Sequence, residues 1–252
     1  MTLELEPIRN DPAYRIVSRA LEQKILSGDI AIGDTLPSEL ALAEQLKVNR
    51  STVREAIRLL EQDGLVRRRQ GGKKLFVTVP RGEDITKRLQ ATMILQEVTF
   101  RELMETMAAI EPASADAAAR RVTPALIEKL AANLEKTRAA LDDRRNLTEL
   151  DIEFHSLVAE ASQNRALQLA LEPITQLFYP AFYNVFALLN AGKRLLFAHE
   201  KIFESIKRQD EREARAWMAR HIADFKRGYE LLNLDLDGSI GRPDPAAARA
   251  ER

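Results

Sequence analysis

The chain contains three histidines, and all of them lie in its second half, at His155, His199 and His221. Each falls on the apolar side of a segment with helical periodicity, among leucine, isoleucine and phenylalanine residues. Asp151 precedes His155 by four residues, so these two side chains share one face of a helix. The pattern predicts that three imidazoles and one carboxylate point from three helices into one interior.

This set of side chains is chemically suited to hold a metal ion. Buried polar groups need partners, and a single ion can satisfy four of them at once. Three nitrogens and one oxygen suit a divalent transition metal, with zinc the first choice and nickel, manganese or iron as alternatives. A five- or six-coordinate ion would keep one or two positions open for another ligand. We therefore predict Asp151, His155, His199 and His221 as metal ligands.

Other interpretations of the same residues stay open at the level of sequence. A histidine on an apolar face is usually a core residue hydrogen-bonded to a neighbour. A metal could also be purely structural, without any effector. A metal-dependent enzyme is a further alternative, since such a centre can activate water or oxygen. No second acid or base is apparent for that chemistry, because Glu153 lies on the polar side of the helix that carries Asp151.

The segment that must position these residues spans about 84–234. It is rich in Ala, Leu, Glu, Lys and Arg with helical periodicity, and it predicts an antiparallel, all-helical bundle of six or seven helices with short loops. Residues 235–252 contain several glycines and prolines, and we expect them to form a flexible tail. The predicted breaks between helices fall at Glu111-Pro112, Thr123-Pro124, Asp142-Asp143, Gln163-Asn164, Gly192 and Gln209-Asp210.

The first 80 residues show a different pattern, that of a helix-turn-helix. A short helix is predicted at about 38–46, with Ser38 as its N-cap. A second helix is predicted from Arg50 to the break at Gly64, with Asn49 as its N-cap. Two short helices joined by a brief turn match the geometry in which the second helix lies in the major groove of DNA.

The second of these helices has two distinct faces. Its apolar face recurs at the spacing expected for burial and consists of Val53, Ala56, Ile57 and Leu60. Beside it runs a row of arginines, Arg50, Arg54 and Arg58. Such a row is often just a solvated helix face. Here we expect it to meet phosphates and base edges, because the caps, the turn and the following hairpin agree with a DNA reader.

Two β-rich segments, 65–70 and 73–79, follow the second helix and flank a glycine pair, as in a hairpin or wing. Residues 50–74 hold 8 Lys or Arg against 3 Asp or Glu, whereas the whole chain balances 38 against 38. The positive charge is therefore local, as expected for a surface that meets the DNA backbone.

Three motifs within residues 10–79 resemble the winged helix-turn-helix signature of the GntR family of bacterial transcription regulators. They are Leu36-Pro-Ser-Glu39, Thr52-Val-Arg-Glu-Ala56 and Asp63-Gly-Leu-Val66. In that family the first turn of the recognition helix and the tip of the wing touch DNA. By position, the resemblance implies DNA contacts by Asn49, Arg50, Ser51, Thr52, Arg54, Gln70 and Gly71. The chain departs from the family at Leu40, where members commonly carry an arginine used on phosphate or guanine.

The segment Asp151-Ile-Glu-Phe-His155 and the later His199 and His221 are similar to the FCD domain, the effector domain of the FadR-like branch of that family. The resemblance covers about residues 84–232. It implies a bundle of six or seven helices whose metal is held by one Asp and three His, with Asn164 near the cavity. In such members the open metal positions face a pocket for a small carboxylate. Met107 is a departure, because an arginine often reaches the effector from its position.

Composition limits the remaining possibilities. The 252 residues include no cysteine, no run of 18 apolar residues and no signal segment, so we expect a cytoplasmic protein without a membrane partner.

We expect a mostly α protein with a DNA-binding domain over 1–80 and a metal-binding, effector-binding and dimerisation domain over 84–234. Two reading heads suit a palindromic double-stranded operator, so we expect a homodimer, with repression favoured. A small organic acid would modulate operator binding.

Overall fold

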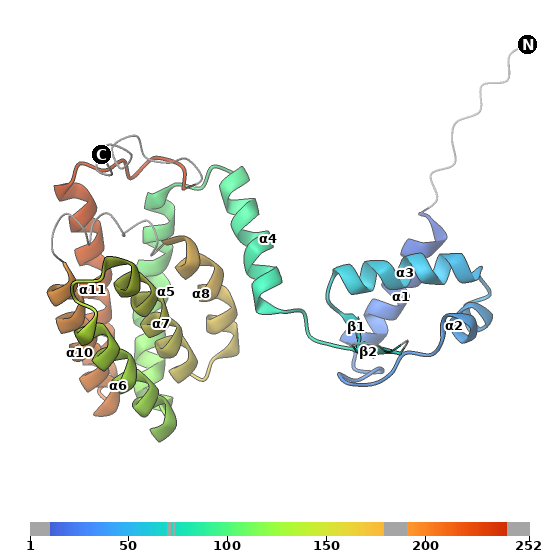
Figure 1. Cartoon of the computed structure of the whole chain (residues 1–252), viewed down its shortest axis with the longest axis horizontal. Coiled ribbons are helices and arrows are strands. Elements are labelled where there is room, and N and C mark those ends of the chain that lie inside the picture. The colour runs from blue at the N-terminus through green and yellow to red at the C-terminus, as the bar shows by residue number, and fades with distance from the viewer. Residues whose placement is uncertain (1–10, 70–71, 73, 179–190, 241–252) are drawn as a thin grey trace, which may run out of the picture. The chain divides into compact units, whose positions relative to one another are not determined.

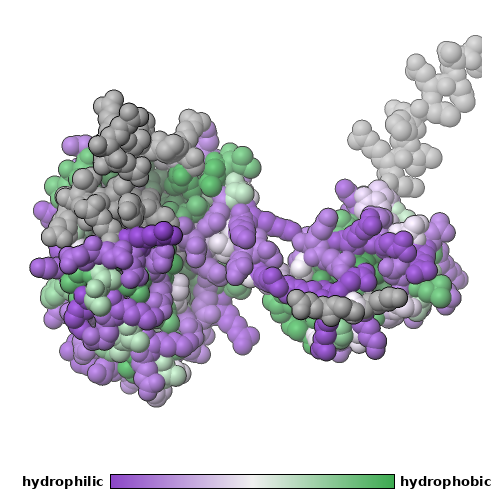
Figure 2. All heavy atoms as spheres, in the orientation of Figure 1, coloured by the Kyte–Doolittle hydropathy of each residue, from purple (hydrophilic) through white to green (hydrophobic). Residues whose placement is uncertain are grey.

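The structure, a computed structural model, describes residues 11–69, 72, 74–178 and 191–240. The chain divides into two compact units, residues 1–84 and residues 85–252, and each is described by itself. The described residues are mostly helical, with one small sheet, as predicted (Figure 1). None of the helices in these ranges is long and apolar enough to cross a membrane. In Figure 2 hydrophilic residues prevail on the visible surface, with hydrophobic residues in smaller patches.

The first unit is the predicted winged helix-turn-helix. The hydroxyl of Ser38 caps α2 by accepting a hydrogen bond of 3.1 Å from the backbone N–H of Ala41. Asn49 is the N-cap residue of α3, although its side chain makes no capping bond. The elements of this unit are α1 (Ala13–Leu26), α2 (Glu39–Leu46), α3 (Arg50–Gln62), β1 (Val66–Arg68) and β2 (Leu75–Val77).

The core of the first unit is the predicted apolar face of α3, which is buried against α1 and α2. Gly64 ends α3 with φ +74°, and a Cβ there would lie 3.1 Å from Cα of Pro80, so glycine suits this turn. β1 then pairs antiparallel with β2, with Val66 opposite Val77. The predicted wing residues Gln70 and Gly71 lie outside the described residues.

The second unit is a helical bundle, as predicted. α5 packs against α7, α8, α10 and α11 and is therefore its central helix (Figure 1). The helices described in this part of the chain are α4 (Gly82–Leu95), α5 (Phe100–Arg121), α6 (Pro124–Ala139), α7 (Arg144–Ala161), α8 (Arg165–Phe178), α10 (Gly192–Lys207) and α11 (Glu211–Leu231).

The predicted break at Glu111-Pro112 is wrong, because α5 continues through both residues. A proline inside a helix costs one backbone hydrogen bond, and burial of α5 among four neighbouring helices offsets that cost here. A break that the sequence analysis missed separates α4 from α5. There Glu97 has φ 55°, and Thr99 and Glu102 form a capping box at the start of α5.

The predicted flexible tail is wrong for residues 235–240, which dock on the bundle. Leu236 and Ile240 pack against its hydrophobic core. The backbone N–H of Ile240 donates to the carbonyl of Val98 over 3.0 Å, and Arg101 pairs with Asp237 at 2.7 Å. Apolar side chains spaced along this short segment therefore anchor it to the α4–α5 connection. Residues 241–252 lie outside the described residues.

Candidate functional site

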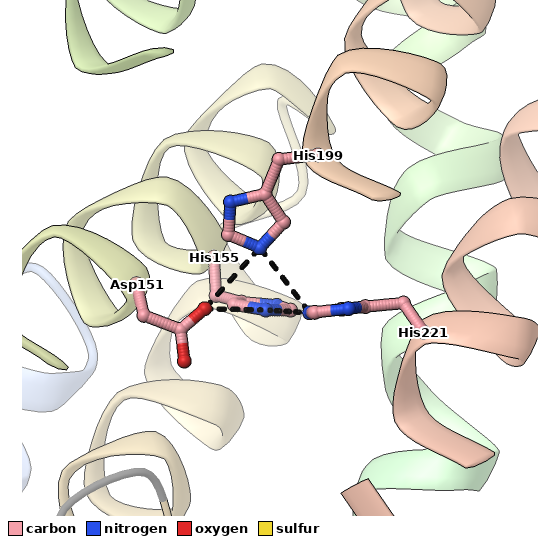
Figure 3. A group of neighbouring side chains, drawn as sticks. All are labelled: Asp151, His155, His199 and His221. Atoms are coloured by element: carbon pink, nitrogen blue, oxygen red, sulfur yellow. Dashed lines mark hydrogen bonds and ion pairs between the residues drawn. The ribbon is translucent and has the colours of Figure 1, made fainter. Parts of the chain in front are cut away.

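Three helices of the bundle bring the predicted ligands together. α7 supplies Asp151 and His155, α10 supplies His199, and α11 supplies His221. All four side chains are buried, and one donor atom from each lies within 4.8 Å of every other. Figure 3 shows the carboxylate and the three rings pointing toward one another.

The spacing of the donor atoms suits a single ion. Nε2 of His221 lies 3.1 Å from Nε2 of His155 and 3.2 Å from Nε2 of His199. Oδ1 of Asp151 lies 3.2 Å from Nε2 of His199 and 3.7 Å from Nε2 of His155. Adjacent donors around an ion with bonds of about 2.0–2.1 Å stand roughly 3 to 3.4 Å apart. Three of these four separations fall in that range.

The electrostatics of the cluster also fit a cation. Burial raises the pKa of Asp151 to about 7, an effect that His155 opposes. Burial, with His155 as a second cause, lowers the pKa of His199 well below its usual value. Burial also lowers the pKa of His221, and the two neighbouring histidines add to this effect. His199 and His221 are therefore neutral, which is the form that binds metals.

The carboxylate of Asp151 supplies a further test of fit. Neither of its buried oxygens accepts a well-formed hydrogen bond from any residue in the described ranges, although Oδ1 contacts His199. A buried carboxylate without such partners is costly, and a cation would remove that cost. The residues present therefore fit a divalent metal.

Glu111 is a buried residue of this site that the sequence analysis missed. Its Oε1 lies 3.1 Å from Nδ1 of His155, on the ring nitrogen opposite the one that faces the cluster. Burial lowers the pKa of His155, but the charge and close contact of Glu111, together with the charge of Asp151, raise this pKa overall. The sequence does indicate that Glu111 is buried, because Glu111 follows the apolar Met107 by four residues and so shares its helix face.

Asn164 and Glu153, two further residues considered in the sequence analysis, make their hydrogen bonds outside the donor cluster. Oδ1 of Asn164 accepts hydrogen bonds from the backbone N–H groups of Ala166 at 3.1 Å and Leu167 at 3.3 Å, so Asn164 caps α8. An effector contact by this residue stays a prediction. Glu153 accepts a hydrogen bond from Nδ2 of Asn133 at 3.0 Å and is no part of the donor cluster.

The predicted DNA-reading surface lies at the start of α3. Asn49, Arg50, Ser51 and Arg54 are exposed, and Thr52 is partly buried. Two of the arginines converge on one carboxylate that the sequence analysis did not single out as their partner. Oε2 of Glu39 lies 3.3 Å from Nε of Arg50 and 3.1 Å from Nη2 of Arg54.

A winged helix-turn-helix in the same chain as a helical bundle defines a class of two-domain DNA-binding regulators. Comparison with known families leads to the same class of protein. Residues 13–73 match "Bacterial regulatory proteins, gntR family", and residues 102–224 match "FCD domain". The chain belongs to the GntR family and carries an FCD domain, so it is a DNA-binding transcription regulator and not an enzyme.

Individual relatives support this assignment. The Exu regulon transcriptional regulator of Escherichia coli K12 is 30% identical over 218 residues, covering 84% of this chain and 83% of its own. The Glc operon transcriptional activator of the same strain is 27% identical, covering 90% and 92% respectively. A solved structure, Streptococcus agalactiae GntR, is 28% identical with a TM-score of 0.62, covering 85% of this chain and 99% of its own.

Proposed function

We propose that this regulator holds a divalent transition metal through Asp151, His155, His199 and His221, and that a small organic acid bound at the metal changes its affinity for operator DNA. The observation that carries this proposal is the convergence of one carboxylate oxygen and three Nε2 atoms in the buried bundle interior. Zinc is the first choice for this donor set, and nickel, manganese or iron are alternatives.

Each part of the donor set has a definite task. In their neutral form the three imidazoles would supply lone pairs, and Asp151 would supply the negative charge that a buried cation needs. When bound, the metal supplies a Lewis-acid position at which a carboxylate can coordinate. Met107, which is buried and uncharged, cannot pair with such an acid. The metal then carries most of the recognition of the carboxylate.

The DNA-reading part of the proposal concerns the first unit. We propose that DNA contacts are made by Asn49, Arg50, Ser51, Thr52, Arg54, Gln70 and Gly71. A homodimer would place two such surfaces on a palindromic duplex, which multiplies weak half-site binding. Effector binding can change operator affinity only through a difference in affinity between two arrangements of the protein, with a coupling of about 1–3 kcal/mol.

The proposal is tested on the purified full-length chain. Elemental analysis gives the metal content, and melting curves with and without a chelator show whether the metal stabilises the bundle. Operator duplexes selected from a random pool then report DNA affinity with and without a panel of organic acids. We expect a stoichiometric metal, a lower melting temperature after chelation, and one acid that shifts operator affinity about 5- to 150-fold.

A matched pair of variants separates the metal site from general stability. His199→Ala removes a central donor, so it should abolish stoichiometric metal and the effect of the chelator on melting. Glu149→Gln, an exposed position on α7, should keep both. If the wild-type protein is metal-free and its melting temperature does not change with chelator, the three histidines are ordinary core residues. If the protein holds metal but no acid changes its operator affinity, the metal is purely structural.

A further inference from the structure

A surface groove between α10 and α11 borders the donor cluster at one of its four residues. Its volume is about 370 Å³, within the range of small-molecule sites, and His221 forms part of its lining. His221 is 5% exposed, whereas the other three members of the donor cluster are at most 1% exposed. Of the four donors, His221 is therefore the one that a molecule in this groove can contact.

The walls of the groove are rich in positive charge. Lys193 and Arg194 lie in the first turn of α10, and Arg220 lies on α11. Basic residues are unfavourable at the positive end of a helix dipole, so an anion bound there would relieve a local conflict. Arg194 has a partial partner, since its Nε lies 3.5 Å from Oδ2 of Asp224. In the described part of the chain, neither Lys193 nor Arg220 has an ion-pair partner.

Aromatic rings form the apolar part of the same groove. Phe197 is 51% exposed, and its ring meets that of Trp217 edge-on at a centroid distance of 5.7 Å. The guanidinium of Arg220 lies 4.8 Å from the centroid of the Trp217 ring. An exposed ring and a partly buried ring beside cations favour a ligand with a flat or apolar body and a negative charge.

We propose that the α10–α11 groove is the subsite that selects the effector, and that it takes an organic anion with an aromatic or otherwise apolar body. This inference rests on the proposed function, because it names the ligand class of that regulator. Lys193 and Arg220 attract the anion, Phe197 and Trp217 hold its body, and contact with His221 links occupancy to the metal centre.

The chain offers a direct reporter for this groove, because Trp217 is its single tryptophan. The probe is benzoate, titrated into the full-length, metal-loaded protein at constant ionic strength. Benzamide keeps the ring and removes the charge, and acetate keeps the charge and removes the ring. We expect a saturable change in Trp217 fluorescence with benzoate, and binding at least roughly tenfold weaker for the other two compounds.

Variants test which cations are responsible. Lys193→Gln and Arg220→Gln should each weaken benzoate binding roughly tenfold, as expected for the loss of one charge-assisted hydrogen bond. Lys226→Gln is the matched control, because Lys226 lies on α11 and pairs with Glu230 at 3.8 Å. Equal benzoate affinity in the wild type and all three variants would overturn the proposed subsite.

Metal content and operator affinity, measured in the same samples, distinguish the two levels of the proposal. If a metal is present and an acid shifts operator affinity while benzoate leaves Trp217 unchanged, the proposed function stands and the groove subsite is overturned. If Trp217 responds to protein concentration and not to benzoate, the groove is a contact between copies, which also overturns it. If benzoate titrates Trp217 in a metal-free protein, the groove site is supported and the proposed function fails.

Discussion

Oε1 of Glu111 lies 3.1 Å from Nδ1 of His155, and both side chains are fully excluded from solvent. The opposite ring nitrogen, Nε2, faces the donor cluster. The contact has the geometry of a close ion pair and not of a well-formed hydrogen bond. A carboxylate this close to Nδ1 favours the proton on that nitrogen and leaves Nε2 as the free donor atom. Glu111 is thus placed as a positioning residue for the candidate metal centre.

The first prediction concerns this pair. Glu111→Gln keeps the size of the side chain but removes its charge, so it should weaken metal affinity about 10- to 100-fold. Competition with a metal-binding dye measures the affinity, and Glu149→Gln on α7 serves as the charge-matched surface control. Restoration of affinity in Glu111→Asp would support positioning by a carboxylate. Wild-type affinity in Glu111→Gln would show that this contact only fills space in the core.

The second prediction concerns the start of α3. Arg50→Ala and Arg54→Ala should each weaken operator binding by about 1–3 kcal/mol, the usual value of a good base contact. Melting of the helical bundle and metal content should not change. Arg19→Ala is the control, since Arg19 lies on α1 and pairs with Asp11 at 2.8 Å. Unchanged operator affinity in both α3 variants would remove α3 as the reading helix.

Glu39 leads to the third prediction. The hydrogen bond from Arg54 lowers the pKa of Glu39, so the carboxylate is charged at neutral pH and holds both arginines. Glu39→Gln should release Arg50 and Arg54 and remove a negative charge beside the DNA. We expect tighter binding to nonspecific DNA and a ratio of specific to nonspecific affinity that falls roughly tenfold.

Measurements with selected operator and scrambled duplexes over a series of salt concentrations test this prediction. The control is Glu55→Gln. This variant removes the same charge from α3, but Glu55 pairs with Arg58, at 2.8 Å, and not with Arg50 or Arg54. A ratio that stays at the wild-type value would mean that Glu39 does not position the arginines for base reading.

The sequence was sufficient for features that depend on local rules. The apolar face of α3 and the Ser38 cap follow from spacing and capping chemistry, and the structure has both. The convergence of His155, His199 and His221 was predictable as a shared interior, because each residue sits on an apolar helix face.

Other features depend on contacts between distant parts of the chain. Pro112 is a reliable break signal in isolation, but packing of α5 at the centre of the bundle overrides it. The partner of Glu111 could not be predicted, because it lies on another helix. The same is true of the Glu39 contacts to α3, which join side chains from two different helices.

The last prediction concerns residues 235–240. The glycines and prolines of the tail led us to expect a flexible segment there, but these residues dock on the bundle. This segment buries parts of Leu236 and Ile240, and its carbonyls accept hydrogen bonds from the backbone N–H groups of Phe100 and Arg101 at 3.2 and 2.8 Å. A chain ended after Leu234 should therefore lose roughly 1–3 kcal/mol of stability by denaturant unfolding. A chain ended after Ile240 is the matched control and should unfold like the full-length protein. Equal stability of the two truncated chains would show that the docked segment contributes nothing to the bundle, whereas a loss confined to the shorter chain would establish it as part of the folded domain.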